Sequence, residues 1–319
     1  MITRDTLQPT RITRSVKVLA WLLLLSHSGI ILTGALVRLT GSGLGCPTWP
    51  KCTPESWTNT PEMGIHGYIE FGNRMLTFVL VAIAVASVLH FWRLRHERKE
   101  IVVLSFVLAA VIPTQAVIGG ITVLMELNPW SVGLHFIPSA AAVATATYIV
   151  RRTGDSGIRD HTAEGSAGPV LPHLRTVAWL LAVLTAVVVV LGILTTGAGP
   201  HSGDVASTRN GFDPEIVSRL HALPVWLLVG CTVLALVVAV RARLSFLARP
   251  LLVLLAVEVL QGVIGYTQYF SGLPVPLVAA HMIGVCLTIA AATAVVDATY
   301  PRRPLDQDPS VRSLASRSS

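Results

Sequence analysis

Three histidines lie inside long apolar stretches, where an ionisable side chain is a candidate for function. His135, His221 and His281 each follow the start of such a stretch by about five to seven residues, so a helical rise of 1.5 Å per residue gives them one common depth of roughly 10 Å. Imidazoles that face each other across a helical bundle commonly hold a haem iron. We therefore predict that His221 and His281 clamp one iron and that His135 serves a second haem site.

A glutamate is expected at the same depth. Glu70 lies in the segment Ile69–Arg74, and a carboxylate within a membrane is unfavourable unless it is paired. Arg74 is four residues further along, so an ion pair within one helix is the simplest interpretation. Glu258 lies in another apolar stretch, and the sequence suggests neither a partner nor a role for it.

Two cysteines, Cys46 and Cys52, lie in a short polar segment that we assign to the outer face. Because that face is oxidising, we expect a disulfide between them. A structural staple and a redox-active pair are both compatible with the spacing, whereas a zinc site would need a second pair of cysteines or histidines nearby.

The elements that must position these residues are membrane helices. Only 13% of the 319 residues are charged and 52% are hydrophobic, whereas a soluble domain carries roughly 25% charged residues. Membrane helices need roughly 20 mostly apolar residues. The predicted fold class is all-α integral membrane, with eight transmembrane helices at about residues 17–38, 67–91, 101–124, 130–150, 175–197, 215–240, 249–270 and 275–298.

The basic residues predict the orientation. All but five of the 24 lysines and arginines fall at the termini or in the three loops that eight spans place on the same side. Under the positive-inside rule both termini are cytoplasmic, in a multi-pass protein of the plasma membrane. This distribution indicates a lipid bilayer and no nucleic acid as partner. We expect neither a cleaved signal peptide nor an organelle transit peptide.

The spans repeat. Gln115–Gly119 matches Gln261–Gly265, and a histidine follows each glutamine by 20 residues. Each half holds an even number of helices, so we predict two parallel four-helix bundles related by a pseudo-two-fold axis along the membrane normal. The predicted units are a cytoplasmic tail, an N-terminal half, a cytoplasmic linker, a C-terminal half and a cytoplasmic tail, at 1–16, 17–150, 151–174, 175–298 and 299–319.

Over about residues 17–298 the chain resembles the haem A synthase family. The resemblance rests on the histidines, on the loop Gly-Ser-Gly-Leu-Gly-Cys-Pro-Thr-Trp-Pro that begins at Gly41, on the segment Glu70–Arg74, and on Gly199-Pro-His-Ser-Gly-Asp204. The short first outer loop and the sequence Glu-Phe-Gly-Asn-Arg resemble those of the actinobacterial members of the family.

The resemblance implies an oxidoreductase. Family members oxidise the C8 methyl group of haem O to a formyl group, by two successive hydroxylations and loss of water, and so supply haem A for cytochrome oxidase. It further implies a haem b cofactor on His221 and His281, the substrate haem on His135, and Glu70 as the catalytic glutamate. Haem O is the implied substrate, and haem O synthase and a membrane electron acceptor are the further partners.

One position departs from the family pattern. Members commonly have a histidine three residues after the glutamate, where this chain has Asn73, and an amide is a poor iron ligand. His66 lies about 10 Å further outward on the same helix face and could bind only a shifted haem. We expect His135 alone to hold the substrate iron. The C-terminal half would then hold a six-coordinate electron carrier, and the N-terminal half an iron with an open coordination position.

Three arginines lie at or just inside outer helix ends, namely Arg38, Arg74 and Arg219. They either extend toward the interface or pair with anionic groups, and we predict contacts with haem propionates.

Other functions make different demands. A two-histidine b-type cytochrome for electron transfer explains the histidines but not Glu70 or a second haem site. A parallel-repeat transporter needs polar, broken helices at mid-membrane. A disulfide oxidoreductase needs a second outer cysteine pair, which this sequence lacks.

Overall fold

The computed structural model describes residues 12–96, 98–154 and 171–300. Within these ranges the chain is helical and contains no strand, and two short 3-10 turns, Pro61–Met63 and Trp92–Leu94, flank the second helix. The eight long helices are α1 (Arg14–Leu39), α2 (Gly64–Phe91), α3 (Lys99–Leu124), α4 (Pro129–Thr153), α5 (Leu171–Ala198), α6 (Pro214–Arg241), α7 (Ser245–Phe270) and α8 (Val275–Ala298).

All eight helices are long and apolar enough to cross a membrane, which confirms the predicted number and order of spans. The observed helices are longer than the predicted spans at several ends, because their polar terminal turns continue the backbone hydrogen bonding. In particular, α4 ends at Thr153 and α5 begins at Leu171, so helix covers both ends of the predicted linker. Most of that linker and of both predicted tails lies outside the described residues.

Local sequence determines where two histidine-bearing helices begin. The Asn128 side chain accepts the amide of Trp130 at 3.0 Å before Pro129 opens α4. The Asp213 carboxylate accepts the amides of Glu215 and Ile216 at 2.8 and 3.0 Å before α6 opens with a proline. A side-chain acceptor followed by proline at the first helical position is a strong helix start, and the first turn then determines the depth of each histidine.

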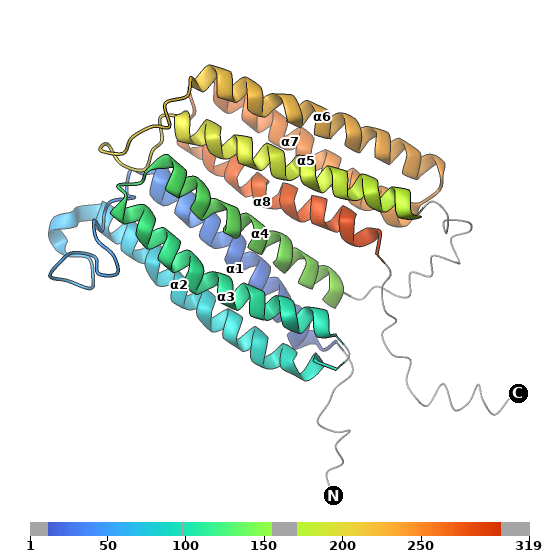
Figure 1. Ribbon diagram of the computed structural model, residues 1–319, viewed down its shortest axis with the longest axis horizontal. Helices are drawn as coiled ribbons and strands as arrows, with labels where there is room; N and C mark the ends of the chain where they lie inside the picture. The colour runs from blue at the N-terminus through green and yellow to red at the C-terminus, as the bar shows by residue number, and fades with distance from the viewer. Residues whose placement is uncertain (1–11, 97, 155–170, 301–319) are drawn as a thin grey trace, which may run out of the picture.

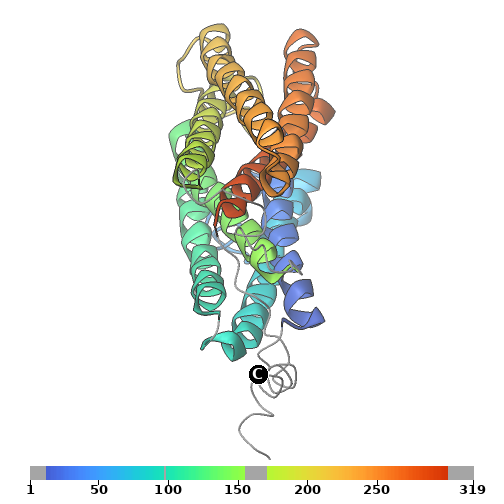
Figure 2. The same ribbon diagram turned by 90° about the vertical axis from the view of Figure 1, so that its right-hand side faces the viewer.

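The helices form two groups that lie side by side (Figure 1). In the first group, contacts join α1 to α2, α2 to α3, α3 to α4 and α4 to α1. In the second group, contacts likewise join α5 to α6, α6 to α7, α7 to α8 and α8 to α5. Between the groups, α4 contacts α8 and α5, and α1 contacts α8. Figure 2 shows the ends of α4 and α8 meeting between the two groups. An axis between α4 and α8 would exchange these contacts, and the pseudo-two-fold relation itself stays a prediction.

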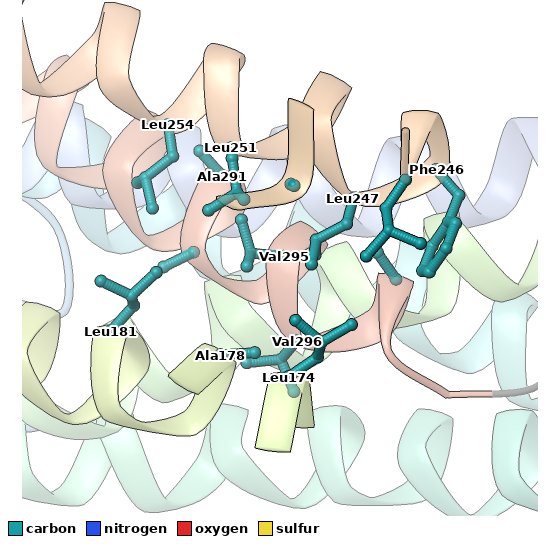
Figure 3. Close-up of a cluster of buried hydrophobic side chains, with 14 of the residues drawn as sticks. Leu174, Ala178, Leu181, Phe246, Leu247, Leu251, Leu254, Ala291, Val295 and Val296 are labelled. Atoms are coloured by element: carbon teal, nitrogen blue, oxygen red, sulfur yellow. The ribbon is translucent and has the colours of Figure 1, made fainter. Parts of the chain in front are cut away.

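The helix ends form two different environments. We call the end where α1 begins and α8 ends the terminal end, and the opposite end, which carries loops 40–63 and 199–213, the loop end (Figure 1). Each group packs its apolar core toward the terminal end. In the C-terminal group the cluster joins α5, α7 and α8 (Figure 3), through Leu174, Leu181, Leu247, Leu251, Leu254 and Val295. The apolar clusters therefore lie toward the terminal end, and the polar side chains of the candidate functional site described below lie toward the loop end.

A buried acidic residue ties the two groups together at the terminal end. Asp297 on α8 is 0% exposed, and its carboxylate contacts Arg151 Nε at 3.1 Å and Arg152 Nε at 2.8 Å on α4. The Arg175 guanidinium lies 4.3 Å from the Tyr300 ring centroid, adding a cation–π contact between α5 and the end of α8. The contact between the groups is therefore electrostatic as well as apolar.

Removing this carboxylate leaves two arginines without their shared acceptor. We expect Asp297→Ala to lower the free energy of unfolding by about 3–5 kcal/mol, the usual cost of breaking a buried ion pair. Glu215→Ala is the matched control, because its partner Arg219 is 77% exposed and such a pair contributes less than about 1 kcal/mol. Thermal unfolding in detergent measures both, and equal losses would refute the role of Asp297.

Candidate functional site

The three histidines lie at equivalent places on three even-numbered helices. His135 is six residues after the start of α4, His221 seven after the start of α6, and His281 six after the start of α8. All three helices begin at the loop end. The rise of an α-helix therefore places the imidazoles at a similar depth, about 10 Å from the helix ends, as the sequence predicted.

Each imidazole packs against a glycine of the preceding helix. A Cβ built on Gly119, Gly192 or Gly265 would lie 3.1, 3.2 or 3.5 Å from the Cε1 atom of its partner histidine. The pairs join α3 to His135, α5 to His221 and α7 to His281. Because glycine has no Cβ, the ring can approach the neighbouring backbone closely. We call these three glycines the glycine seats.

The N-terminal half lacks a fourth pair of this kind. The repeat matches Gly29 on α1 to Gly192 on α5, but no side-chain atom lies within 4 Å of a Cβ built on Gly29. On α2, Asn73 stands where family members commonly have histidine, and its Oδ1 atom is buried without a hydrogen bond to any described residue.

The Nδ1 atoms of these three histidines have different surroundings from that of His27. The Nδ1 atoms of His135, His221 and His281 are buried and make no well-formed hydrogen bond within the described ranges. By contrast, His27 Nδ1 pairs with the carbonyl of Leu23 on its own helix at 2.8 Å. Three buried imidazoles at one depth, whose Nδ1 atoms make no well-formed hydrogen bond, are candidates for ligand binding.

The donor set of the C-terminal half fits a haem iron. His221 and His281 come from α6 and α8, which both pack against α7. No group of three or more histidine, cysteine or acidic side chains that could hold a bare metal ion occurs in the described part of the chain. Two imidazoles suffice when a porphyrin supplies the remaining ligands of the iron.

Glu70 forms the centre of the N-terminal site. The predicted ion pair is present, with Arg74 Nη2 at 2.5 Å from Glu70 Oε1. The other carboxylate oxygen, Oε2, accepts the backbone amide of Cys46 at 2.6 Å. Glu70 is 5% exposed, so this carboxylate is stabilised inside the protein by one guanidinium and one amide.

Arg74 binds the loop that carries the cysteines. Its guanidinium donates to the carbonyls of Cys46, Thr48 and Lys51 at 2.8, 2.9 and 3.3 Å. Together with two bonds to Glu70, these contacts occupy all five N–H groups of the side chain. The predicted Cys46–Cys52 disulfide is also present. Arg74 thus holds the disulfide loop over α2, and no donor is left for another anion.

The same loop reaches α3 and the start of α2. The Trp49 ring occupies the space that a Cβ on Gly120 would need, next to the glycine seat of His135. His66 Nδ1 lies 2.9 Å from Ser42 Oγ, so this histidine is bound to the loop rather than turned toward His135. The loop therefore covers the N-terminal site at the loop end.

The two other arginines have different surroundings. Arg38 crosses between the halves, donating through Nε to the carbonyl of His201 at 2.5 Å and through Nη2 to that of Thr196 at 2.8 Å. Arg219 forms an exposed pair with Glu215 on its own helix. Neither arrangement tests the predicted propionate contacts, but both arginines keep donors that the described residues do not use.

Some contacts of the site were not predicted from the sequence. Gln115 Nε2 donates to the carbonyl of His135 at 2.8 Å and also contacts Ser139, which positions α4 against α3. The repeated Gln-x-Val-Ile-Gly pattern indicated the repeat but not this contact. The glycine that ends each copy of this pattern, Gly119 or Gly265, is a glycine seat. Each precedes its histidine by 16 residues, and this repeated separation is the sequence signal that could have identified the contact.

Comparison with known proteins identifies the sequence family of this architecture. The family model COX15-CtaA, described as cytochrome oxidase assembly protein, matches residues 17–293. This range includes the disulfide loop, Glu70, the three histidines and most of α8.

Curated relatives carry one shared name, heme A synthase. The relative from Symbiobacterium thermophilum is 32% identical over 165 residues, 51% of this chain and 53% of the relative. That from Alkalihalophilus pseudofirmus is 31% identical over 134 residues, 42% of this chain and 44% of the relative. The Bartonella henselae protein is 24% identical over 250 residues, 67% of each chain. The chain spans about half the length of most of these relatives.

Arg74→Leu should release the disulfide loop, because it removes five hydrogen bonds at once. We expect faster cleavage by trypsin after Lys51, at least several-fold, in folded protein in detergent. Arg219→Leu is the control, since it removes an exposed arginine remote from the loop and should leave the cleavage rate unchanged. Equal rates in the wild type and both variants would show that the disulfide and the other contacts of the loop order it without Arg74.

Proposed function

Because the chain belongs to the COX15-CtaA family of cytochrome oxidase assembly proteins, we propose that it is a haem A synthase that oxidises the C8 methyl group of haem O to a formyl group. The observation that carries this proposal is the difference between its halves. One half has two histidines seated against glycines, and the other has one seated histidine with the Glu70–Arg74 pair near the same depth. A simple electron carrier would not require the second arrangement.

The chain is a multi-pass membrane protein. We propose that it lies in the plasma membrane with the terminal end cytoplasmic and the loop end outside. The basic residues around the terminal end support this orientation. The disulfide loop would then face the oxidising compartment, where such a bond persists.

The C-terminal half is the proposed site of the resident haem b. His221 on α6 and His281 on α8 would be its axial ligands, and their glycine seats would keep both rings in place. When bound, this cofactor supplies one-electron transfer. The chain contributes ligand orientation and an apolar surrounding, which together adjust a haem's reduction potential.

The N-terminal half is the proposed site of the substrate, haem O. His135 would hold its iron from α4, and Gln115 would fix the backbone around that histidine through the bond to its carbonyl. Asn73 offers no ligand of comparable strength on α2. His66 is engaged by Ser42, which supports ligation by His135 alone.

Glu70 is the proposed catalytic residue. Its carboxylate would lie beside the reacting methyl group, where it would accept a proton or stabilise positive charge as electrons leave the porphyrin. Arg74 and the Cys46 amide hold the carboxylate in one orientation, which reduces the reorganisation needed during reaction. The disulfide loop would exclude water from this place.

Propionate binding is the proposed role of Arg38 and Arg219, both of which lie near the loop end and keep free donors. Arg74 could contact a propionate only by giving up bonds to the disulfide loop. Haem O synthase as the source of substrate and a membrane carrier as electron acceptor complete the proposal.

The enzyme proposal is tested by co-expression with a haem O synthase, followed by extraction and chromatography of the haems. We expect haem A from the wild type, and no haem A from Glu70→Gln, which keeps the size of the side chain but removes its charge. Glu215→Gln is the matched control and should give the wild-type yield, because this glutamate is exposed.

The outcomes separate the competing functions. Haem A at the wild-type level in Glu70→Gln would exclude the proposed role of that carboxylate. Bound haem b without haem A in the wild type would favour a two-histidine cytochrome, and absence of any haem would favour a transporter.

The cofactor site makes a second prediction. His221→Ala and His281→Ala should each abolish the low-spin spectrum of the resident haem b in purified protein. His27→Ala removes a buried histidine that is bonded to its own helix, and it should keep that spectrum. Retention of the spectrum in either ligand variant would place the cofactor elsewhere.

A further inference from the structure

A second buried carboxyl lies in the C-terminal half. Glu258 is near the middle of α7 and is 3% exposed. Its Oε1 atom accepts the hydroxyl of Thr232 on α6 at 3.0 Å, while Oε2 is buried and makes no hydrogen bond within the described ranges. An ionisable group at this depth is unfavourable unless it serves a function.

Polar side chains continue from Glu258 toward the loop end. Gln261, Gly265 and Gln268 follow at intervals of three, four and three residues, which places all four positions on one face of α7. Gly265 is the seat of His281. The stripe therefore runs from Glu258 to the histidine over seven residues, or about 10 Å.

This stripe retains unsatisfied hydrogen-bonding capacity. Gln261 Nε2 and Gln268 Oε1 are both buried without a hydrogen bond to any described residue. The Gln261 side chain lies where a Cβ on Gly284 would be, three residues after His281 on α8. These polar atoms and Glu258 Oε2 share one face of α7 with the seat of His281, so a buried carboxyl lies where a change in the charge of the histidine site would act on it in a surrounding of low dielectric.

The N-terminal half repeats the glutamine and the glycine of this stripe, as Gln115 and Gly119, but not the acid. The repeat that matches Gln115 to Gln261 places Ile112 at the position of Glu258. Ile112 is buried in the apolar core of its own half. The carboxyl is therefore not a requirement of the helix packing, and it occurs only in the half that has the histidine pair.

We infer that Glu258 takes up a proton when the resident haem is reduced. Reduction adds one electron to the iron and lowers the charge of the site by one, and binding of one proton from water to the Glu258 carboxylate restores it. The electron comes from oxidation of the substrate in the enzyme, or from a chemical reductant in a titration. This inference rests on the proposed cofactor site.

The titratable groups on the neighbouring helices are the alternatives for this role. Among the described elements, α6 and α8 are the ones that pack against α7. Their titratable or charged side chains are His221, Cys231, His281 and Cys286 within the spans, with Glu215, Arg219, Arg241 and Asp297 near the ends. The two histidines are the proposed ligands, Cys286 packs in the cluster between the halves, and Asp297 is paired with arginines.

Redox titration of the purified, haem-loaded protein at a series of pH values tests the inference. The midpoint potential of the wild type should fall with rising pH, approaching about 59 mV per pH unit over part of the range for one proton per electron. Glu258→Gln should give a potential that does not change with pH. Glu258→Asp should restore the slope, and Glu100→Gln, a carboxyl at the start of α3, should not alter it.

A slope that persists in Glu258→Gln, or a wild type without any slope, would overturn the inference. If Glu258→Gln does not accumulate with haem, infrared difference spectra of the wild type and Glu258→Asp decide the question. A carboxyl band that appears on reduction and shifts between them supports Glu258, and its absence excludes it. The low-spin haem spectrum is recorded on the same samples, so failure of this inference is distinct from failure of the cofactor site.

Discussion

The close approach of an imidazole to the backbone of a neighbouring helix is the contact on which the rest of this structure depends. It occurs at Gly119, Gly192 and Gly265, and each time it joins an odd-numbered helix to the even-numbered helix after it. A Cβ at Gly119 or Gly192 would lie so close to the ring that the imidazole would have to move by a few tenths of an ångström, whereas at Gly265 it would make ordinary contact. The seats therefore let each imidazole pack directly against the neighbouring helix.

The two halves use this shared arrangement differently. In the C-terminal half two seated histidines come from helices on either side of α7, whereas the N-terminal half has one, with Asn73 on the other helix. In the N-terminal half, the buried Glu70 carboxylate is paired with Arg74, and the same arginine also binds the disulfide loop. The proposed roles of the two halves therefore depend on one difference: near the same depth, the N-terminal half has Asn73 and the Glu70–Arg74 pair where the C-terminal half has a second seated histidine.

The division of the bundle into two ends follows from the same constraint. Polar groups in a membrane need partners within the protein, and the Glu70–Arg74 pair with its bonds to the disulfide loop meets this need near the loop end. The terminal end instead carries the apolar cores and the contact of Asp297 with two arginines, which joins the halves. The apolar packing and the link between the halves are thus at one end, and the seated histidines lie toward the other.

The sequence by itself determined the eight spans, the common depth of the histidines, the disulfide and the Glu70–Arg74 pair. Each depends on local properties: the apolar length needed to cross lipid, the rise of a helix, or a separation of a few residues. Only the tertiary structure showed the glycine seats, the bond from Cys46 to Glu70, the bridge from Arg38 to His201 and the contact of Thr232 with Glu258. These contacts join different helices or loops, and they depend on how the helices pack, which the periodicity of a single segment does not specify.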